Sequence, residues 1–283
     1  TIKESEKRIS APGISDNSRG VAGLFGLIWA IKKEKPLLHG DIWLVANVGE
    51  EGLGDLYGMR EVVRRFGDAP TAYIILEGMG LGRVFNRGLG VKRHKISAHT
   101  PGGHSWANYG SPSAIHELAK LVNQIIDIKL PDSPRTSMNV GVIEGGTSIN
   151  TIANQASIQL DLRSVSQDEL LKLEDKVKKL VAKSNKKNIL FEIEVIGNRP
   201  SGEIADSHPL VNISLEEHKQ AGIQANLNIG STDANIPLSL GLPAICMGLT
   251  TGGNPHRLDE FMHKAPLAKG LDILYKIVTR LLA

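Results

Sequence analysis

The sequence has few of the features that mark secreted, membrane-spanning or nucleic-acid-binding proteins. It contains one cysteine, Cys246, in 283 residues, so it cannot form an internal disulfide. The apolar run PAICMG around Cys246 favours a buried core residue. No apolar run is long enough to cross a membrane, and no segment resembles a signal peptide. From these absences we predict a cytoplasmic protein with no membrane partner.

The charge balance also lacks an excess of one sign. The 33 basic and 30 acidic residues leave a formal net charge of +3. This charge is too small to indicate nucleic-acid binding, and no basic run is interleaved with aromatic residues. The 41% hydrophobic and 22% charged fractions are typical of a globular protein with a substantial core. We therefore expect no nucleic-acid partner.

The first part of the chain predicts alternating helices and strands. Residues 17–34 have helical apolar spacing, and Asp16 or Asn17 can cap that helix. Residues 41–48 and 71–76 are short apolar segments rich in β-branched residues, as in strands buried on both faces of a sheet. A helix-like segment, 57–66, lies between them. This β-α-β order predicts an α/β domain with a mixed or parallel sheet.

The pattern changes between about residues 90 and 197. It reads as strand, helix, two strands, helix and strand, and Ser166 with Glu169 forms a capping box before the second helix. Such a β-α-β-β-α-β unit is similar to ferredoxin-like folds. The parallel-sheet pattern returns after it. We therefore predict one domain interrupted by an inserted α+β domain, with the divisions 1–89, 90–199 and 200–283.

Acidic residues follow the predicted strands or precede the first helix, and a histidine lies in a glycine-rich loop after the strand near residue 245. The carboxyl ends of parallel strands meet at one edge of a sheet, where ligands bind in open α/β folds. We therefore expect five side chains to converge there. They are Asp16, Glu50, Glu51, Glu77 and His256.

A cluster of this composition predicts a metal site. Four carboxylates repel one another unless a cation lies among them. Carboxylates and imidazole without thiolates suit Zn²⁺, Mn²⁺ or Co²⁺. Singly, Asp16 has a simpler interpretation as a helix cap, Glu77 as a strand-end acid and His256 as a loop hydrogen bonder. Together, the five residues favour the metal site.

Seven ordered segments resemble the conserved blocks of the M20 family of metallopeptidases and amidohydrolases. They are APGISDNSRGVAGL, ANVGEEGLGD, ILEGMGLG, PGGHS, GGTSINTIANQASIQLDLR, GSTDAN and NPHRLDE. The family includes carboxypeptidases, aminoacylases, deacetylases, desuccinylases, dipeptidases and tripeptidases. The resemblance implies a zinc-peptidase-like catalytic domain with an inserted lid or dimerisation domain, and a homodimer formed through that lid.

The resemblance also implies the roles of the clustered residues. It implies two divalent metal ions, most simply zinc, with cobalt or manganese as alternatives. Asp16 would bridge the ions, Glu51 and His256 would complete the ligands of one, and Glu77 would bind the other. Glu50 would be the general base.

Three residues of the inserted domain resemble the family's substrate-binding groups. His104 would reach over from a partner subunit and stabilise the oxyanion, while Asn150 and Arg163 would hold the substrate's terminal carboxylate and carbonyl. Plainer alternatives remain for each: a loop residue for His104, a turn residue for Asn150, and a salt bridge with Asp161 for Arg163. We expect Asp233 of GSTDAN to serve the site through its loop backbone rather than as a ligand.

The expected function is metal-dependent hydrolysis of an amide bond in short peptides or N-acyl amino acids. The alternative is a non-catalytic metal-binding or dimerising scaffold derived from such a hydrolase. The family's first metal ligand is a histidine in an HxD motif upstream of SDN, but no histidine precedes Asp16 here. We expect the sequence to be a fragment, the alternative being a shortened, inactive protein. The second metal site then has Asp16 and Glu77.

Overall fold

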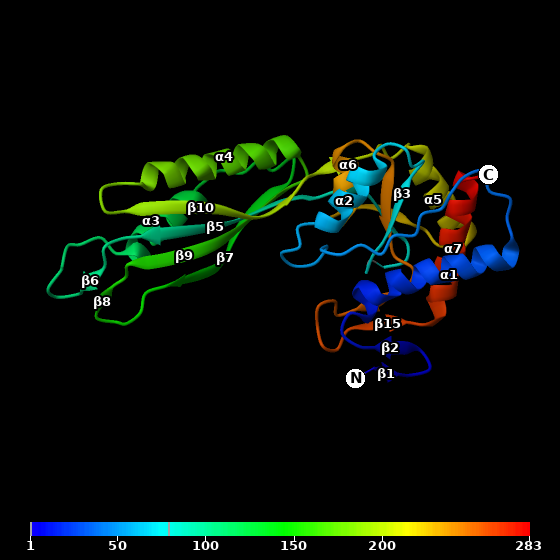
Figure 1. The fold of residues 1–283 in the computed structure, drawn as a ribbon, viewed down its shortest axis with the longest axis horizontal. Helices are drawn as coiled ribbons and strands as arrows, with labels where there is room; N and C mark the ends of the chain where they lie inside the picture. Colours follow the sequence, from blue (N-terminus) through cyan, green and yellow to red (C-terminus); the bar gives the residue numbers. More distant parts are fainter. Residues whose placement is uncertain (1, 79) are drawn as a thin grey trace. The chain divides into compact units, whose positions relative to one another are not determined.

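The computed structural model describes residues 2–78 and 80–283. Internal contacts divide the chain into two compact units (Figure 1). Unit 1 contains Thr1–Glu50, Leu56–Gly88 and Gly202–Ala283, and unit 2 contains Leu89–Ser201 together with Glu51–Asp55. None of the helices in the described part of the chain is long and apolar enough to cross a membrane.

Unit 1 is built around a mixed sheet with the order β11-β4-β13-β3, and β12 pairs with β4. β3 runs parallel to β13, and β4 runs antiparallel to β13. Every residue of β13 is buried because helices cover both faces of this sheet. The strands are β3 (Tyr73–Leu76), β4 (Arg83–Gly88), β11 (Gly202–Glu203), β12 (Asn226–Gly230) and β13 (Ala244–Met247).

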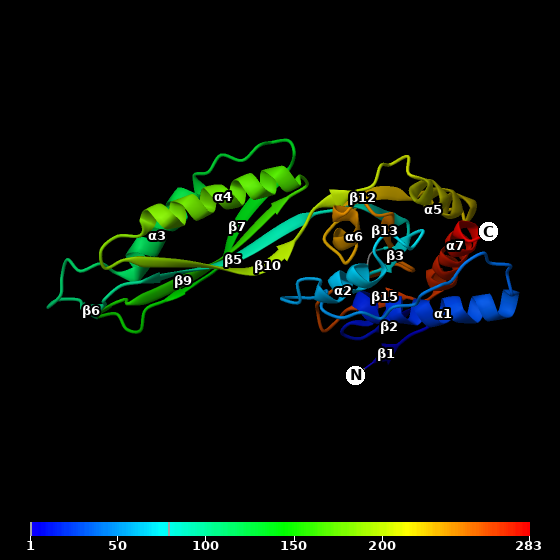
Figure 2. The ribbon, with the colours of Figure 1, turned by 45° about the horizontal axis from the view of Figure 1, so that its top comes forward.

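The helices of unit 1 lie on both sides of this sheet. In Figures 1 and 2, α2 and α6 lie on one side and α5 and α7 on the other, and α1 packs against α7. Their buried apolar residues join those of the strands in one core. The helices are α1 (Arg19–Glu34), α2 (Tyr57–Phe66), α5 (Pro209–Gln220), α6 (Asn235–Ser239) and α7 (Ala265–Leu281).

A second, smaller sheet of unit 1 joins the two ends of its chain, in the order β1-β2-β15-β14. Its strands are β1 (Lys3–Glu4), β2 (Arg8–Ser10), β14 (Gly252–Gly253) and β15 (Phe261–His263). Pairing of β2 with β15 places Ser10 opposite Phe261. The turn η1 (Ile14–Ser18), which carries Asp16, therefore lies near the β14–β15 loop, which carries His256.

The predicted strand at 41–48 is wrong: this segment is extended but belongs to no strand. Ile42 and Leu44 pack on the core, whereas Trp43 is 62% exposed and contacts Phe66 with ring centroids 5.0 Å apart. No strand of residues 2–78 and 80–283 pairs with the segment. An apolar, β-branched run becomes a strand only where another strand supplies backbone partners.

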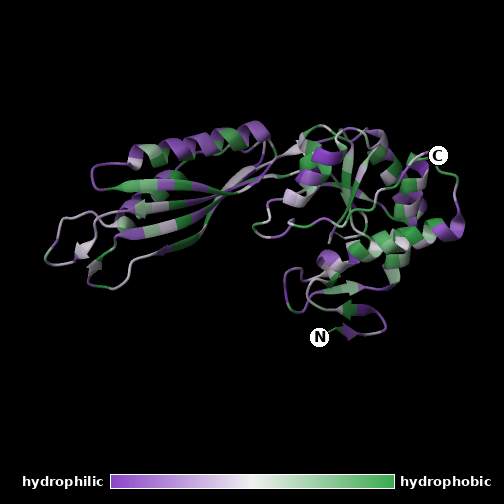
Figure 3. Ribbon diagram, viewed as in Figure 1, coloured by the Kyte–Doolittle hydropathy of each residue, from purple (hydrophilic) through white to green (hydrophobic). Residues whose placement is uncertain are grey.

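α1 is also more exposed than its apolar sequence would suggest. Figure 3 shows hydrophobic residues over most of this helix. Val21, Phe25 and Trp29 recur at helical spacing and are 45%, 58% and 72% exposed. The opposite face is the packed one: Gly26 allows the close approach of Leu271 of α7, whose side chain lies 2.8 Å from where a Cβ would be.

Unit 2 is an antiparallel sheet with the order β10-β5-β9-β7, and α3 and α4 cover one of its faces (Figure 2). Ser166 Oγ accepts a hydrogen bond from the Glu169 amide at 3.4 Å, so the predicted helix cap is confirmed. The elements are β5 (Gly90–His99), β6 (Gly103–His104), α3 (Ala114–Ile126), β7 (Thr136–Gly145), β8 (Thr151–Ile152), β9 (Gln155–Ser164), α4 (Gln167–Ser184) and β10 (Leu190–Arg199). This is the α+β architecture that the sequence predicts.

Candidate metal centre

The turn that carries Asp16 is held by a buried carboxylate. Glu260 is 1% exposed, and its Oε1 accepts hydrogen bonds from the amides of Ser15 and Asp16, both at 2.7 Å. Its Oε2 accepts one from the Gly13 amide at 2.9 Å. Three charge-assisted bonds to successive parts of one turn fix the backbone from which the Asp16 side chain projects.

The helix-cap interpretation of Asp16 is not what the structure shows. Asn17 Oδ1 accepts from the Gly20 amide at 3.1 Å, and Asn17 Nδ2 donates to the Leu76 carbonyl at 2.7 Å. The Asp16 carboxylate instead lies beside the imidazole of His256, with Oδ2 3.5 Å from Nε2. Asn17 therefore serves the start of α1, and Asp16 faces the candidate site.

His256 lies in a loop with an unusual backbone conformation. Its φ is +62°, in the left-handed region that histidine seldom adopts. Asp259 braces the loop by accepting from Arg257 Nε at 2.8 Å and from Asn254 Nδ2 at 2.9 Å. A residue held in this conformation by its neighbours, with its ring 66% exposed, is typical of a functional position.

Glu77 follows β3, where its amide donates to the Met247 carbonyl at 3.1 Å. Its side chain is buried, at 7% exposed. Burial, and then the negative charges of Glu50 and Asp16, raise the pKa of Glu77 to about 9. A carboxyl that holds its proton this strongly is one that lacks a sufficient positive partner.

Arg19 supplies part of the missing positive charge. This guanidinium is 1% exposed, and it donates to the carbonyls of Thr250 at 2.9 Å and Glu77 at 3.4 Å. Burial lowers the pKa of Arg19, while the charges of Asp16, Glu260 and Glu77 oppose that change. The sequence analysis did not identify Arg19 or Glu260, although both lie in matched segments, SDNSRG and NPHRLDE.

The residues present fit a divalent metal ion. Asp16, Glu51 and His256 each offer a ligand atom, and these atoms lie within 4.8 Å of one another. Two carboxylates and one imidazole form an oxygen–nitrogen donor set that suits Zn²⁺, Co²⁺ or Mn²⁺. Glu77 adds a carboxyl whose pKa is raised by burial and then by the charges of Glu50 and Asp16.

In unit 2, the structure brings His104 and Asn150 together. The Ser105 amide donates to the Asn150 carbonyl at 2.9 Å, and His104 pairs with Thr151 across the β6–β8 ladder. His104 Nδ1 accepts from the Trp106 amide at 3.2 Å, which requires the ring proton to be on Nε2. His104 therefore presents an exposed N–H donor.

Arg163 lies at the other end of unit 2. It forms the salt bridge that the sequence left open as an alternative, with Nε 2.6 Å from Asp161 Oδ2. The eight steps of β9 from Gln155 to Arg163 span roughly 27 Å, at about 3.4 Å per residue. Asn150 precedes Gln155, so Asn150 and Arg163 of one subunit cannot hold the same substrate group.

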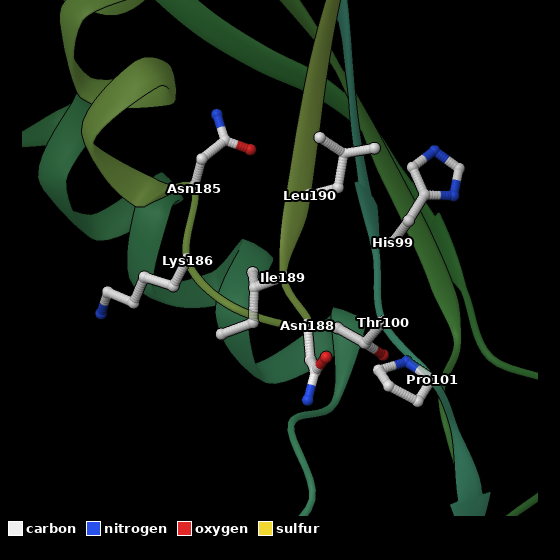
Figure 4. A pocket seen from close by; sticks show the side chains of 8 residues that line it. All are labelled: His99, Thr100, Pro101, Asn185, Lys186, Asn188, Ile189 and Leu190. Atoms are coloured by element: carbon white, nitrogen blue, oxygen red, sulfur yellow. The ribbon is translucent and has the colours of Figure 1, made fainter.

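A hollow of unit 2 lies elsewhere and involves none of these residues. It has a volume of about 440 Å³ and is bordered by the end of β5 and the α4–β10 connection (Figure 4). The figure shows side chains of mixed character around it rather than a set of acids. The lining residues are His99, Thr100, Pro101, Asn185, Lys186, Asn188, Ile189 and Leu190. It does not have the chemistry of a metal site.

Comparison with known proteins agrees with this architecture. Residues 89–189 match the family model of the peptidase dimerisation domain. A peptidase M20 domain-containing protein of Sordaria macrospora is 29% identical over 176 residues, covering 56% of this chain and 37% of that relative. The inserted unit therefore matches the peptidase dimerisation domain, and the chain is similar to M20 peptidases.

Two solved M20-type structures show how far the fold extends. Aminopeptidase PepT from Bacillus cereus has a TM-score of 0.80 at 22% identity, covering 99% of this chain and 76% of PepT. The YXEP protein of Bacillus subtilis, a dinuclear metal-binding peptidase of the M20 family, has a TM-score of 0.68 at 14% identity, covering 93% and 71%. The chain therefore has the fold of these proteins, an α/β unit interrupted by an inserted α+β unit that matches the dimerisation domain, as the sequence predicts.

Proposed function

We propose that this protein is a metal-dependent hydrolase that cleaves the amide bond of short peptides or N-acyl amino acids. The observation that carries the proposal is the group Asp16, Glu51 and His256, whose ligand atoms lie within 4.8 Å of one another. Beside it lies Glu77, a buried carboxyl whose pKa is raised by burial and by the charges of Glu50 and Asp16. Such a group is stabilised as an anion when a cation enters. The peptidase relatives support hydrolysis as the use of that cation.

In this proposal, Asp16, Glu51 and His256 would hold one divalent ion, and Asp16 and Glu77 would hold a second. Zinc fits the donor set best, and cobalt or manganese also fits. When bound, the metal would supply Lewis-acid chemistry, namely a lowered pKa of water and a polarised scissile carbonyl. Glu50 takes the proton of the attacking water and later passes it to the departing amine nitrogen.

The lid completes the site as part of a homodimer. His104 of the partner subunit donates its Nε2 proton in a hydrogen bond to the developing oxyanion, and Asn150 acts beside it because the two share one loop pair. Arg163 comes from the subunit that carries the metal centre. It holds the substrate's terminal carboxylate and gives up its salt bridge with Asp161 to do so. The separation of Asn150 and Arg163 along β9 supports this division between subunits.

A cytoplasmic location remains a prediction from the sequence and its single cysteine.

The test is hydrolysis of a panel of dipeptides, tripeptides and N-acetyl amino acids, after chelation and after return of Zn²⁺, Co²⁺ or Mn²⁺. Glu50→Gln should keep its metal and lose about 10²- to 10⁴-fold in kcat. Full activity of that variant would remove the general-base role, and metal binding without turnover on any substrate would favour the non-catalytic scaffold.

The partner role of His104 has its own test. His104→Ala and Glu50→Gln proteins should each be nearly inactive, and mixed dimers should regain activity because one of their two sites has both residues intact. Failure of mixed dimers to recover would place His104 in the same subunit as the metal centre that it serves.

A further inference from the structure

The segment that carries Glu50 is fixed without a β-ladder. Residues 41–48 belong to no strand of the described chain, yet Glu50 has to be placed within hydrogen-bond reach of one water proton. Asn47, three residues before Glu50, donates a hydrogen bond from Nδ2 to Asp233 Oδ2 at 2.7 Å. This bond joins positions 186 residues apart in the sequence.

Asp233 is well placed to act as an anchor. It is 5% exposed and lies in a turn between β12 and α6 that is stabilised by hydrogen bonds within the turn. The Asn235 amide donates to the Thr232 carbonyl at 3.0 Å, and the Thr232 amide donates to Asn235 Oδ1 at 2.9 Å. α6 in turn packs on β4 and β11. The Asp233 carboxylate is therefore held by the sheet side of unit 1.

The neighbouring bonds of the segment have a different partner. The Gly58 amide donates to the Val48 carbonyl at 3.1 Å, and the Leu56 amide to the Gly49 carbonyl at 2.9 Å. A Cβ on Gly58 would lie 2.2 Å from the Val48 oxygen, so that approach requires glycine. Both bonds tie the segment to the start of α2, which follows it in the chain. The Asn47–Asp233 bond ties it to the turn before α6, which packs on the sheet.

We propose that Asn47 and Asp233 form a positioning pair that fixes Glu50 relative to the metal centre. The proposal rests on the role of Glu50 as general base. Neither residue of the pair touches the substrate; Asp233 acts through Asn47, and Asn47 acts through the backbone up to Glu50. Displacement of a reacting group by about 1 Å is enough to lower a rate by about 10²-fold.

The kinetic test uses Asn47→Ala, Asp233→Ala, the double alanine variant, and the exchanged pair Asn47→Asp with Asp233→Asn. Each single variant should lose about 10²-fold in kcat, with unchanged metal content and KM within about threefold. The kcat of the double alanine variant should be no lower than that of the less active single variant, since all three variants remove the same Asn47–Asp233 bond. The exchanged pair restores donor and acceptor in reverse, so it should recover at least about tenfold.

The matched control is a second Asn–Asp pair of unit 1. Asn86 Nδ2 donates to Asp206 Oδ1 at 2.9 Å, away from the acidic cluster, and Asp206→Asn should leave kcat unchanged. Loss of metal in Asp233→Ala, additive losses in the double variant, or no recovery in the exchanged pair would each overturn the positioning role.

Hydrogen exchange gives a readout that does not depend on turnover. Amides of residues 45–51 should exchange at least about tenfold faster in both single alanine variants, and at the normal rate in the exchanged pair, while α1 stays unchanged. Unaltered exchange would overturn the anchor even in an active enzyme. If the wild-type protein binds metal but turns over no substrate, while the variants show the expected exchange pattern, the hydrolase proposal is overturned and the anchor stands.

Discussion

Glu77 of unit 1 and Glu174 of unit 2 are the same residue type, and they are buried to nearly the same extent, 7% and 5% exposed. Burial by itself would raise the pKa of both side chains. At Glu77 the charges of Glu50 and Asp16 add to burial and raise its pKa to about 9. At Glu174 the hydrogen bonds from Lys178 and Lys92 outweigh burial and lower its pKa to about 2.

The two units differ in how they balance the charge of a buried glutamate. Lys92 Nζ lies 3.0 Å from Glu174 Oε2, and Lys178 Nζ and His94 Nε2 lie 2.9 and 3.0 Å from Oε1. Unit 2 thus neutralises its acid with its own side chains, as a structural ion cluster does. Unit 1 places further acids around Glu77, and the proposed metal ion would balance their charge.

The largest expected effect is in unit 2. Glu174→Gln leaves Lys92 buried without its counter-ion and His94 without its charged hydrogen-bond acceptor, and should lower the free energy of unfolding by about 3 kcal/mol. The measurement is urea denaturation followed by circular dichroism. Asp175→Asn on the same helix is the control, because its pair with Lys179 is exposed on both sides and should cost less than about 1 kcal/mol.

The same substitution at Glu77 should have the opposite outcome. Glu77 is protonated at neutral pH in the metal-free protein, and glutamine has nearly the same shape and charge. Glu77→Gln should therefore leave metal-free stability unchanged while reducing the amount of bound metal. Equal destabilisation by Glu77→Gln and Glu174→Gln would show that both clusters are structural.

A smaller effect is expected at Glu260, a third buried acid, which backbone amides satisfy. Glu260→Gln puts an amide group where an oxygen now accepts from the Asp16 turn, so at least one of the three bonds is lost. Metal affinity should fall about 10- to 100-fold, measured by competition with a chelating dye. Glu203→Gln, at an exposed pair with Arg87, should leave affinity unaltered.

Metal binding should also displace the Glu77 proton. At pH 7.5 the buried carboxyl is protonated, and a metal ligand must be deprotonated. Calorimetric titration of Zn²⁺ in two buffers of different ionisation enthalpy should report release of about one proton from this group. Glu77→Gln should abolish that release; its persistence in the variant would place the titrating group elsewhere.

The smallest effects are opposite pH dependences of the two units in the metal-free protein. Because the pKa of Glu77 rises from 4.5 to about 9 on folding, its contribution to stability is full below pH 4.5 and is lost as the pH rises towards 9. Because the pKa of Glu174 falls from 4.5 to about 2, its contribution is present above pH 4.5 and is lost as the pH falls towards 2.

His94 adds to the acid side of this profile. Burial lowers the pKa of its ring below 6.5, despite the hydrogen bond that the ring donates to Glu174. Its contribution is therefore present above pH 6.5 and is lost below it. Thermal melts across the pH range should show unit 1 weakening in alkali and unit 2 weakening in acid. Glu77→Gln should flatten the alkaline limb and Glu174→Gln the acid limb.

The two units also differ in how well the sequence predicts them. The elements of unit 2 follow directly from periodicity, because each strand pairs with another strand of the same segment and the Ser166 cap is local. In unit 1, the run at 41–48 has a strand-like composition, but composition cannot say whether another strand lies beside it. The strand-like composition of residues 41–48 therefore predicted a strand that does not form, because no neighbouring strand supplies backbone hydrogen-bond partners.

The candidate site was predictable in part for the same reason. Asp16, Glu77 and His256 could be grouped because each adjoins a predicted element whose end faces one sheet edge. Glu260 could not, since it acts on backbone amides 244 to 247 residues away. Asn47 could not either, since its partner lies 186 residues along the chain. Such contacts have no periodicity that a sequence could reveal.

The central claim is that the acids around Glu77 form a divalent metal centre. The most direct measurement is the metal content of the purified protein by elemental analysis, after incubation with Zn²⁺ and removal of free ions, for the wild type and for Asp16→Asn. The account predicts stoichiometric metal in the wild type and its loss in Asp16→Asn. Metal-free wild-type protein, or equal metal in the two proteins, would contradict it.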